Sequence, residues 1–149
     1  MRDKGSMQAD IMAQMRRRVV ISSTIGNALE WFDFTVFGLF AGIIGKLFFP
    51  ADNPSSSLLQ AFGVFGIAFA ARPLGGLVFG LYADKHGRKA ALIIMITLMA
   101  FGTGLLGFLP TYGAIGIAAP LLLLLARLIQ GFSAGGEFGS ASAMLIEFA

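Results

Sequence analysis

Cysteine is absent from this sequence of 149 residues, and histidine occurs once, at His86. Disulfide frameworks, thiolate metal sites and cysteine nucleophiles are therefore excluded. A single histidine leaves no histidine-based zinc cluster, so we expect no bound metal. No serine–histidine pair and no nucleotide-binding loop is present either, and the sequence therefore does not indicate an enzyme.

Charged residues are also scarce. They make up 13% of the chain, against 56% hydrophobic residues and a mean hydropathy of +0.80. Soluble domains carry about 25% charged residues. Since the chain has too few polar residues to cover a water-soluble globule, it is predicted to lie in a membrane.

Four long apolar runs follow a polar N-terminal segment, residues 1–18. Each run reaches the ~20 residues that a helix needs to cross ~30 Å of hydrocarbon. Short connections with turn-forming or charged residues separate the runs, so sequential helices should be antiparallel. We predict an all-α membrane fold with a cytoplasmic segment, 1–18, and four transmembrane helices within 19–149, at approximately 19–45, 58–83, 90–109 and 120–148.

The first run is not a cleaved signal peptide, because it is about twice as long as the 7–15 residues of a signal-peptide core and contains polar residues. Eight of the eleven lysines and arginines lie either before the first run or in the loop "DKHGRK". Such a bias places both segments in the cytoplasm. The sequence thus predicts a multi-pass protein of the plasma (inner) membrane with a cytoplasmic N-terminus. The basic residues indicate membrane topology and not a nucleic-acid partner.

Polar residues inside the first helix require a separate explanation. Asn27, Glu30 and Asp33 follow one another at steps of three, so they share one helix face. A charge at the middle of a bilayer costs ~2.5 kcal/mol or more, and such groups normally face a partner or water. With Val19 at the inner end, Asp33 lies ~21 Å along the helix, near the middle of the bilayer.

The fourth helix offers the matching groups. Arg127, Gln130 and Glu137 fall within an arc of about 80°, and Arg127 lies ~10 Å from the outer end. Asp33 and Arg127 should therefore meet, while Glu30 and Glu137 lie deeper toward the cytoplasm. One interpretation is a static ion pair that joins two helices. The other is an aqueous cavity in which a carboxylate carries protons, its protonation switched by the neighbouring arginine.

Small residues predict close helix packing. Gly131, Gly135 and Gly139 are spaced by four in the fourth helix, as are Gly76 and Gly80 in the second. The segment "GFSAGGEFG" is not a phosphate-binding loop, because neither a lysine nor a preceding strand accompanies it.

Proline and the cytoplasmic loop mark two further features. Pro73 follows Arg72 within the second helix and should kink it, either to line a pathway or as a tolerated bend. In "GLYADKHGRKAAL", Asp84 ends that helix, Gly87 permits a tight turn and Arg88 begins the third helix. The plainer interpretation of this loop is a basic segment that only sets topology.

Several motifs resemble one family. The loop is similar to the G-x-L-A-D-R-x-G-R-K signature of the major facilitator superfamily, and "RLIQGFSAGG" resembles its fourth-helix R-x-x-Q-G motif. The segments "GNALEWFDF", "ARPLGGLVFG" and "RLIQGFSAGGEFGSASAMLIE" narrow the resemblance to the metabolite:proton symporters, which carry citrate, 2-oxoglutarate, shikimate, proline or betaine. It covers nearly all of the chain after residue 18.

The resemblance implies a symporter that works by alternating access. Asp84, Gly87 and Arg88 would belong to a cytoplasmic gate, with Glu147 as the acid at the end of the fourth helix. Asp33 resembles the acid that couples protons in related transporters. The family has twelve helices, so we expect the four helices to be the N-terminal third of a longer, monomeric protein.

We therefore predict a proton-coupled transporter of a small metabolite, powered by the proton gradient without a bound cofactor. An organic acid is favoured, because arginines attract carboxylates. A compatible solute such as proline or betaine is one alternative, and a four-helix membrane scaffold is another. The predicted solute-binding or coupling residues are Arg127, Arg72, Asn27 and Gln130, and the predicted proton carriers are Asp33, Glu30 and Glu137.

Overall fold

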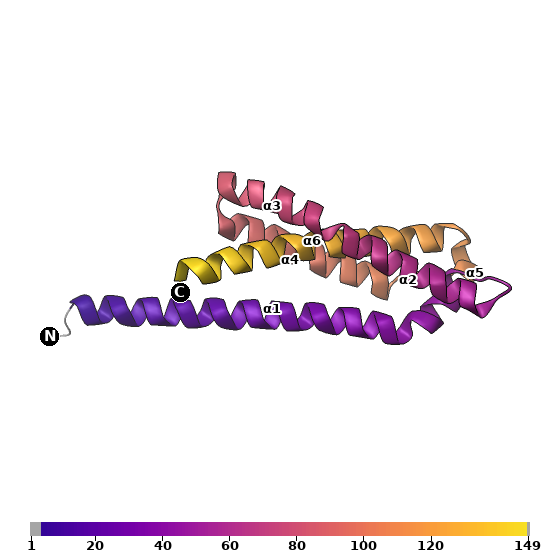
Figure 1. The fold of residues 1–149 in the computed structure, drawn as a ribbon, viewed down its shortest axis with the longest axis horizontal. Helices are drawn as coiled ribbons and strands as arrows, with labels where there is room; N and C mark the ends of the chain where they lie inside the picture. Colours follow the sequence, from indigo (N-terminus) through magenta and orange to yellow (C-terminus); the bar gives the residue numbers. More distant parts are fainter. Residues whose placement is uncertain (1–3, 149) are drawn as a thin grey trace.

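The structure is a computed structural model that describes the backbone of residues 4–148 and the side chains of residues 13–14, 17, 21, 24, 27–28, 30–88 and 90–137. The described chain is helical apart from short connections (Figure 1). Its helices are α1 (Lys4–Phe48), α2 (Pro54–Ala70), α3 (Arg72–His86), α4 (Arg88–Gly107), α5 (Tyr112–Ile115) and α6 (Ala118–Phe148).

In the part of the chain that the structure describes, four segments are long and apolar enough to cross a membrane, which confirms the predicted fold class. Their outward faces carry large hydrophobic side chains, such as Leu39, Leu59 and Phe101, that are 60–77% exposed within the chain. Lipid is the solvent that such a surface requires. The four candidate spans are Glu30–Phe48, Pro54–His86, Ala90–Gly107 and Ala118–Glu137.

The first helix is longer than its apolar run. It begins at Lys4 and not near residue 19, because the polar segment before the run contains good helix formers and no proline. Figure 1 shows the first turns of α1 projecting past the neighbouring ends of α3 and α6. The boundary at residues 18 and 19 is therefore a change of composition within one helix.

The second span is broken where the sequence predicts a kink. Pro73 lacks an N–H group, so the carbonyl of Phe69 has no donor four residues later. The N–H of Ala71 bonds to the carbonyls of Ile67 and Ala68, at 3.1 and 3.3 Å, and α3 starts at the next residue. The span thus continues as two helical segments, α2 and α3.

The spans alternate in direction, and α6 contacts all five other helices (Figure 1). The α3–α4 turn lies at the same end of the bundle as the N-terminal part of α1, while the α1–α2 connection and α5 lie at the opposite end. At that opposite end the side chain of Asn53 accepts a hydrogen bond from the Ser55 N–H and so caps α2, which begins with Pro54.

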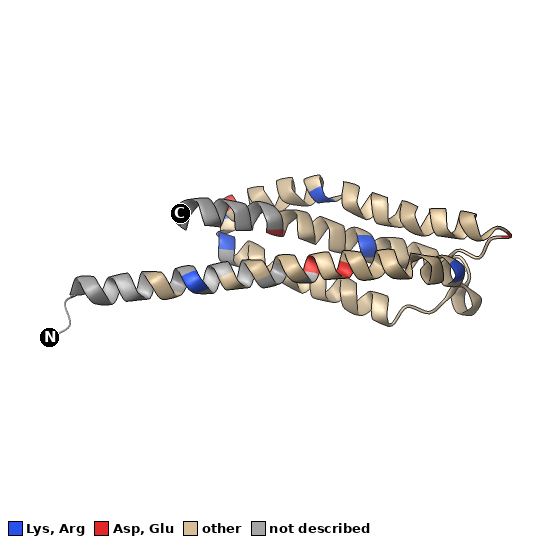
Figure 2. Cartoon of the chain, turned by 60° about the horizontal axis from the view of Figure 1, so that its bottom comes forward, with Lys and Arg blue, Asp and Glu red and all other residues tan. Residues whose placement is uncertain are grey.

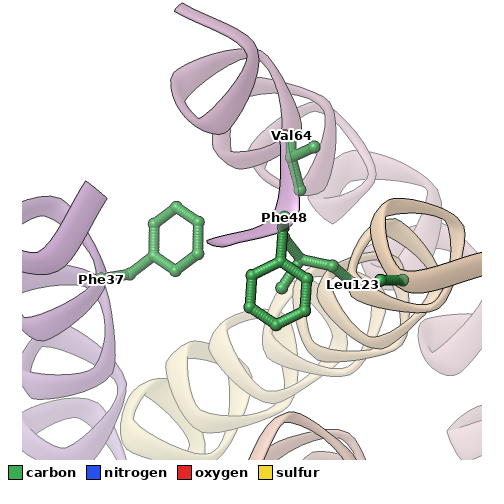
Figure 3. Close-up of a cluster of buried hydrophobic side chains, with 5 residues drawn as sticks. Phe37, Phe48, Val64 and Leu123 are labelled. Atoms are coloured by element: carbon green, nitrogen blue, oxygen red, sulfur yellow. The ribbon is translucent and has the colours of Figure 1, made fainter. Parts of the chain in front are cut away.

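Among the described side chains, two apolar clusters form the interior. The first contains Phe37 and Phe48 of α1, Val64 of α2 and Leu123 of α6, with Ala119 (Figure 3). The second joins α3 to α4 and contains Phe79, Ala83, Ala91 and Met95. Together they fix α1, α3 and α4 around α6, which places the polar face of α1 opposite α6.

Glycines allow α6 to lie directly against the second span. A Cβ atom at Gly131 would stand 1.9 Å from the carbonyl oxygen of Ala68, and one at Gly135 would stand 1.9 Å from that of Arg72. Gly76 is also near α6, because a Cβ atom there would stand 3.3 Å from the carbonyl oxygen of Gly135. Since no larger residue fits at Gly131 or Gly135, these two positions set how close the helices come.

The predicted packing of Gly80 stays a prediction. Among the described residues, no atom of another helix lies within 4 Å of its Cβ position. The buried stripe of α3 consists of Gly75, Phe79 and Ala83, and Gly80 lies roughly 100° around the helix from Phe79. Gly75, which the sequence did not indicate, lies close to α6 instead: a Cβ atom there would stand 1.8 Å from the carbonyl oxygen of Phe132. The packing of Gly139 lies outside the described residues.

Candidate functional site

The predicted contact between Asp33 and Arg127 is confirmed. Arg127 Nη1 donates to Asp33 Oδ2 at 2.6 Å, which joins α1 to α6 within their membrane spans. Arg127 is 5% exposed, and its guanidinium carbon lies 3.9 Å from the ring centroid of Phe37. The arginine is thus held between a carboxylate and an aromatic face.

A second ion pair joins Arg72 to Glu30, both largely buried. The guanidinium of Arg72 lies 4.3 Å from the ring centroid of Phe34 and 4.6 Å from that of Phe69. The sequence did not predict this pair, because helical spacing placed Glu30 at the depth of Glu137 and gave Arg72 no partner. Arg72 is the first residue of α3, so its position opposite Glu30 depends on the break between α2 and α3 at Pro73.

The two pairs repeat one local pattern of α1. Glu30 precedes Phe34 by four residues, and Asp33 precedes Phe37 by four. Residues four apart lie on the same helix face, so each carboxylate has an aromatic ring next to it. Each arginine then receives a charge-assisted contact and a cation–π contact from neighbouring groups. This i, i+4 spacing was visible in the sequence, but its meaning depended on where the arginines lie.

Several polar atoms near the pairs keep unused hydrogen-bonding capacity. Gln130 Nε2 donates to Thr103 Oγ1 of α4 at 2.9 Å. Within the described part of the chain, Gln130 Oε1, Arg72 Nε and Arg127 Nε are buried without a hydrogen-bond partner. Buried polar groups are normally satisfied, so these atoms are where a ligand or water would bind. Thr103 is a contact that sequence reasoning did not find.

The remaining predicted site residues differ in their placement. Asn27 is exposed on α1, and Glu137 is half-buried on α6. The charge of Glu137 repels that of Glu30, and Asp33 repels it as well. Three carboxylates therefore share this region with two arginines. Glu147 belongs to the part of α6 whose side chains lie outside the described residues.

The turn between α3 and α4 has the predicted geometry. Gly87 ends α3 and precedes α4 with a φ of 88°, which a residue with a Cβ rarely adopts. Asp84 is exposed on the last turn of α3, and Arg88 is half-buried at the start of α4. The imidazole of His86 stacks on Tyr82, with ring centroids 4.3 Å apart.

Charges are confined to few places in the described bundle. Figure 2 shows acidic positions in the middle of α1 and basic positions on α3 and α6, separated by long stretches of uncharged residues. Two buried ion pairs inside spans are expensive in lipid, where an apolar interface would join helices at lower cost. The arrangement is typical of a polar path through a membrane domain.

The chain is similar in sequence to known proteins that are named as transporters. The chain is 46% identical to the proline/betaine transporter of Salmonella typhimurium over 132 residues, which are 89% of this chain and 26% of that protein. It is 45% identical to the glycine betaine/proline/ectoine/pipecolic acid transporter of Dickeya dadantii, with the same coverage. A putative proline/betaine transporter of Staphylococcus aureus is 47% identical over 136 residues, 91% of this chain and 29% of that protein.

The chain thus spans between a quarter and a third of the length of these relatives. No solved structure matches it significantly. The sequence pattern of the family described as "Sugar (and other) transporter" matches residues 19–149, nearly all of the chain after the polar segment. This chain therefore belongs to the sugar (and other) transporter family of the major facilitator superfamily.

Proposed function

We propose that the protein containing this chain is a proton-coupled symporter of a small zwitterionic solute, and that the solute moves by alternating access. The proposal rests mainly on two ion pairs that lie within the membrane spans, Asp33–Arg127 and Glu30–Arg72. The family supports transport, and the names of the relatives support a compatible solute such as proline or betaine.

The solute class differs from the one that the sequence favoured. Arginines in the membrane suggested an organic acid, but the names of the relatives point to zwitterions instead. A zwitterion has a carboxylate and a cationic nitrogen, and the site offers both kinds of partner. The unused donors Arg72 Nε and Arg127 Nε suit the carboxylate, and the three acids suit the cation.

Asp33 is our first candidate for the proton carrier. Its carboxylate is bonded to Arg127, so a solute carboxylate that draws Arg127 away would leave Asp33 without its counter-charge. An unpaired carboxylate in a dry site binds a proton, and return of the arginine releases it. This exchange couples solute binding to protonation, with the proton gradient as the energy source and no bound cofactor. Glu30 and Glu137 are the other candidates.

The gate and the orientation complete the proposal. We assign Asp84, Gly87, Arg88 and Glu147 to a gate on the cytoplasmic side, where the α3–α4 turn lies at the same end as the N-terminal part of α1. The excess of basic residues at that end favours a cytoplasmic N-terminus in the plasma (inner) membrane. The full-length transporter would act as a monomer on its solute and protons within the bilayer.

Uptake by the full-length protein in proteoliposomes tests this function. Radiolabelled betaine and proline should accumulate when the outside is made acidic, and a protonophore should abolish the accumulation. An organic acid such as citrate, supplied in the same way, distinguishes the solute classes. Accumulation that a protonophore leaves unchanged would contradict proton coupling, and no uptake of any solute would support a scaffold instead.

A further inference from the structure

The side chain of Arg72 occupies a site that has the chemistry of a quaternary ammonium site. Phe34 and Phe69 present their ring faces to the guanidinium at 4.3 and 4.6 Å, and Glu30 supplies the counter-charge. Aromatic faces with a nearby carboxylate bind cations that are weakly hydrated, of which the trimethylammonium group is the clearest case. The guanidinium is itself weakly hydrated, so it fits the same surroundings.

The site is open on one side and contains a hydrogen-bond donor that is not in use. Phe69 is 53% exposed within the chain, whereas Glu30 is 8% exposed, so the rings can be reached while the carboxylate is shielded. Arg72 Nε is buried without a hydrogen-bond partner among the described residues. A solute with a carboxylate would satisfy that donor and would draw the guanidinium away from the rings.

We propose that Phe34, Phe69 and Glu30 bind the quaternary ammonium group of a zwitterionic solute after Arg72 moves to the solute's carboxylate. This inference rests on the proposed function and assigns Glu30 to the solute, which leaves the proton to Asp33. Before the solute binds, the guanidinium of Arg72 takes the place of the solute's ammonium group. It keeps Glu30 paired until the solute arrives.

Equilibrium binding to the purified full-length protein, without any ion gradient, tests the assignment. Displacement of radiolabelled betaine is measured with unlabelled betaine and with tert-butylacetate, which has the same shape but carbon in place of the charged nitrogen. Wild type should prefer betaine. Phe34→Leu or Phe69→Leu should weaken betaine binding about 2- to 30-fold. Neither substitution should weaken the binding of tert-butylacetate, which is measured by its displacement of radiolabelled proline.

Matched controls come from the same two helices. Phe40 and Phe62 are 49% and 46% exposed and take no part in the site, so Phe40→Leu and Phe62→Leu should leave the preference intact. If the leucine variants do not fold, phenylalanine with increasing fluorination at Phe34 keeps the shape and weakens the ring's attraction for cations. Betaine affinity should then fall stepwise.

Two outcomes would overturn the inference alone, and two others concern the proposed function. Equal weakening of betaine and tert-butylacetate in the variants, or no effect of fluorination, would exclude an aromatic cation site. If wild type binds neither betaine nor proline, the proposed solute is wrong and this assignment fails with it. Preserved binding with failed accumulation would contradict proton coupling alone.

Discussion

At the residue scale, the two arginines inside the spans are each held by a carboxylate and by aromatic faces. Arg127 is 5% exposed and bonded to Asp33 at 2.6 Å. Removing one partner of a buried pair leaves an uncompensated charge and costs about 3–5 kcal/mol, whereas replacing both with apolar residues costs far less. Loss of either partner alone should therefore destabilise the protein, although the pair itself adds little stability over an apolar contact.

A double-mutant cycle on this pair follows directly. Asp33→Leu should lower the free energy of unfolding by about 3 kcal/mol or more. Adding Arg127→Met should restore much of that loss. Denaturant unfolding of the purified full-length protein measures both, with Lys46→Met, at an exposed position near the end of α1, as the control. Additive losses in the double variant would mean that the two side chains do not depend on each other.

At the element scale, contact between α6 and the second span depends on glycine. Gly131 and Gly135 face carbonyl oxygens of Ala68 and Arg72 so closely that a methyl group would force the helices apart. Gly66 on α2 provides the contrast, because no atom of another described helix lies within 4 Å of its Cβ position. Substitution by a larger residue should thus destabilise the protein at Gly131 and Gly135 but be tolerated at Gly66.

Alanine substitutions measure that difference. Gly131→Ala should lower the free energy of unfolding by about 1–3 kcal/mol, because it overpacks the contact with α2. Gly66→Ala should leave stability unchanged or raise it by up to about 1 kcal/mol, since alanine favours the helix. Thermal or denaturant unfolding in lipid nanodiscs distinguishes the two. Equal effects at both positions would contradict the close packing of α6.

The break between α2 and α3 gives a second prediction at this scale. Pro73→Ala restores a backbone donor and should straighten the span, which moves Arg72 relative to Glu30. Spin labels at Leu59 and Val78, both exposed, should then move farther apart in a dipolar distance measurement, and solute uptake should fall. Pro120→Ala, in the first turn of α6, is the control because no interior hydrogen bond is at stake there. An unchanged distance would show that Pro73 does not bend the span.

The sequence predicted the features that depend on a single helix, but not those that depend on how α3 is bent and rotated against its neighbours. Spans followed from hydropathy alone, and the Asp33–Arg127 contact followed from helical rise, because both residues lie in the middle of uninterrupted helices. The Glu30–Arg72 pair and its two rings depend on the bend at Pro73 and on the rotation of α3, which spacing along one chain does not contain. The close approach at Gly75 was missed for the same reason, because the rotation of α3 decides which of its glycines face α6.

At the scale of the whole molecule, the ends of the bundle differ in charge. Lysines and arginines gather near the N-terminal end and the α3–α4 turn, whereas Lys46 lies near the opposite end. The proposed orientation therefore predicts which side each end faces.

Cysteine labelling in a cysteine-free background checks the orientation. Lys85→Cys in whole cells should resist an impermeant maleimide until the membrane is opened. Lys46→Cys should react from outside. This chain contributes no cysteine of its own to the background. The reverse pattern would invert the proposed topology.

Coupling through Asp33 is the central claim, and one measurement tests it most directly. Full-length wild type and Asp33→Asn are compared in proteoliposomes for accumulation driven by a pH gradient and for solute counterflow, which needs no net proton movement. We predict that Asp33→Asn abolishes accumulation and retains counterflow. Accumulation equal to that of wild type would remove Asp33 from the coupling mechanism.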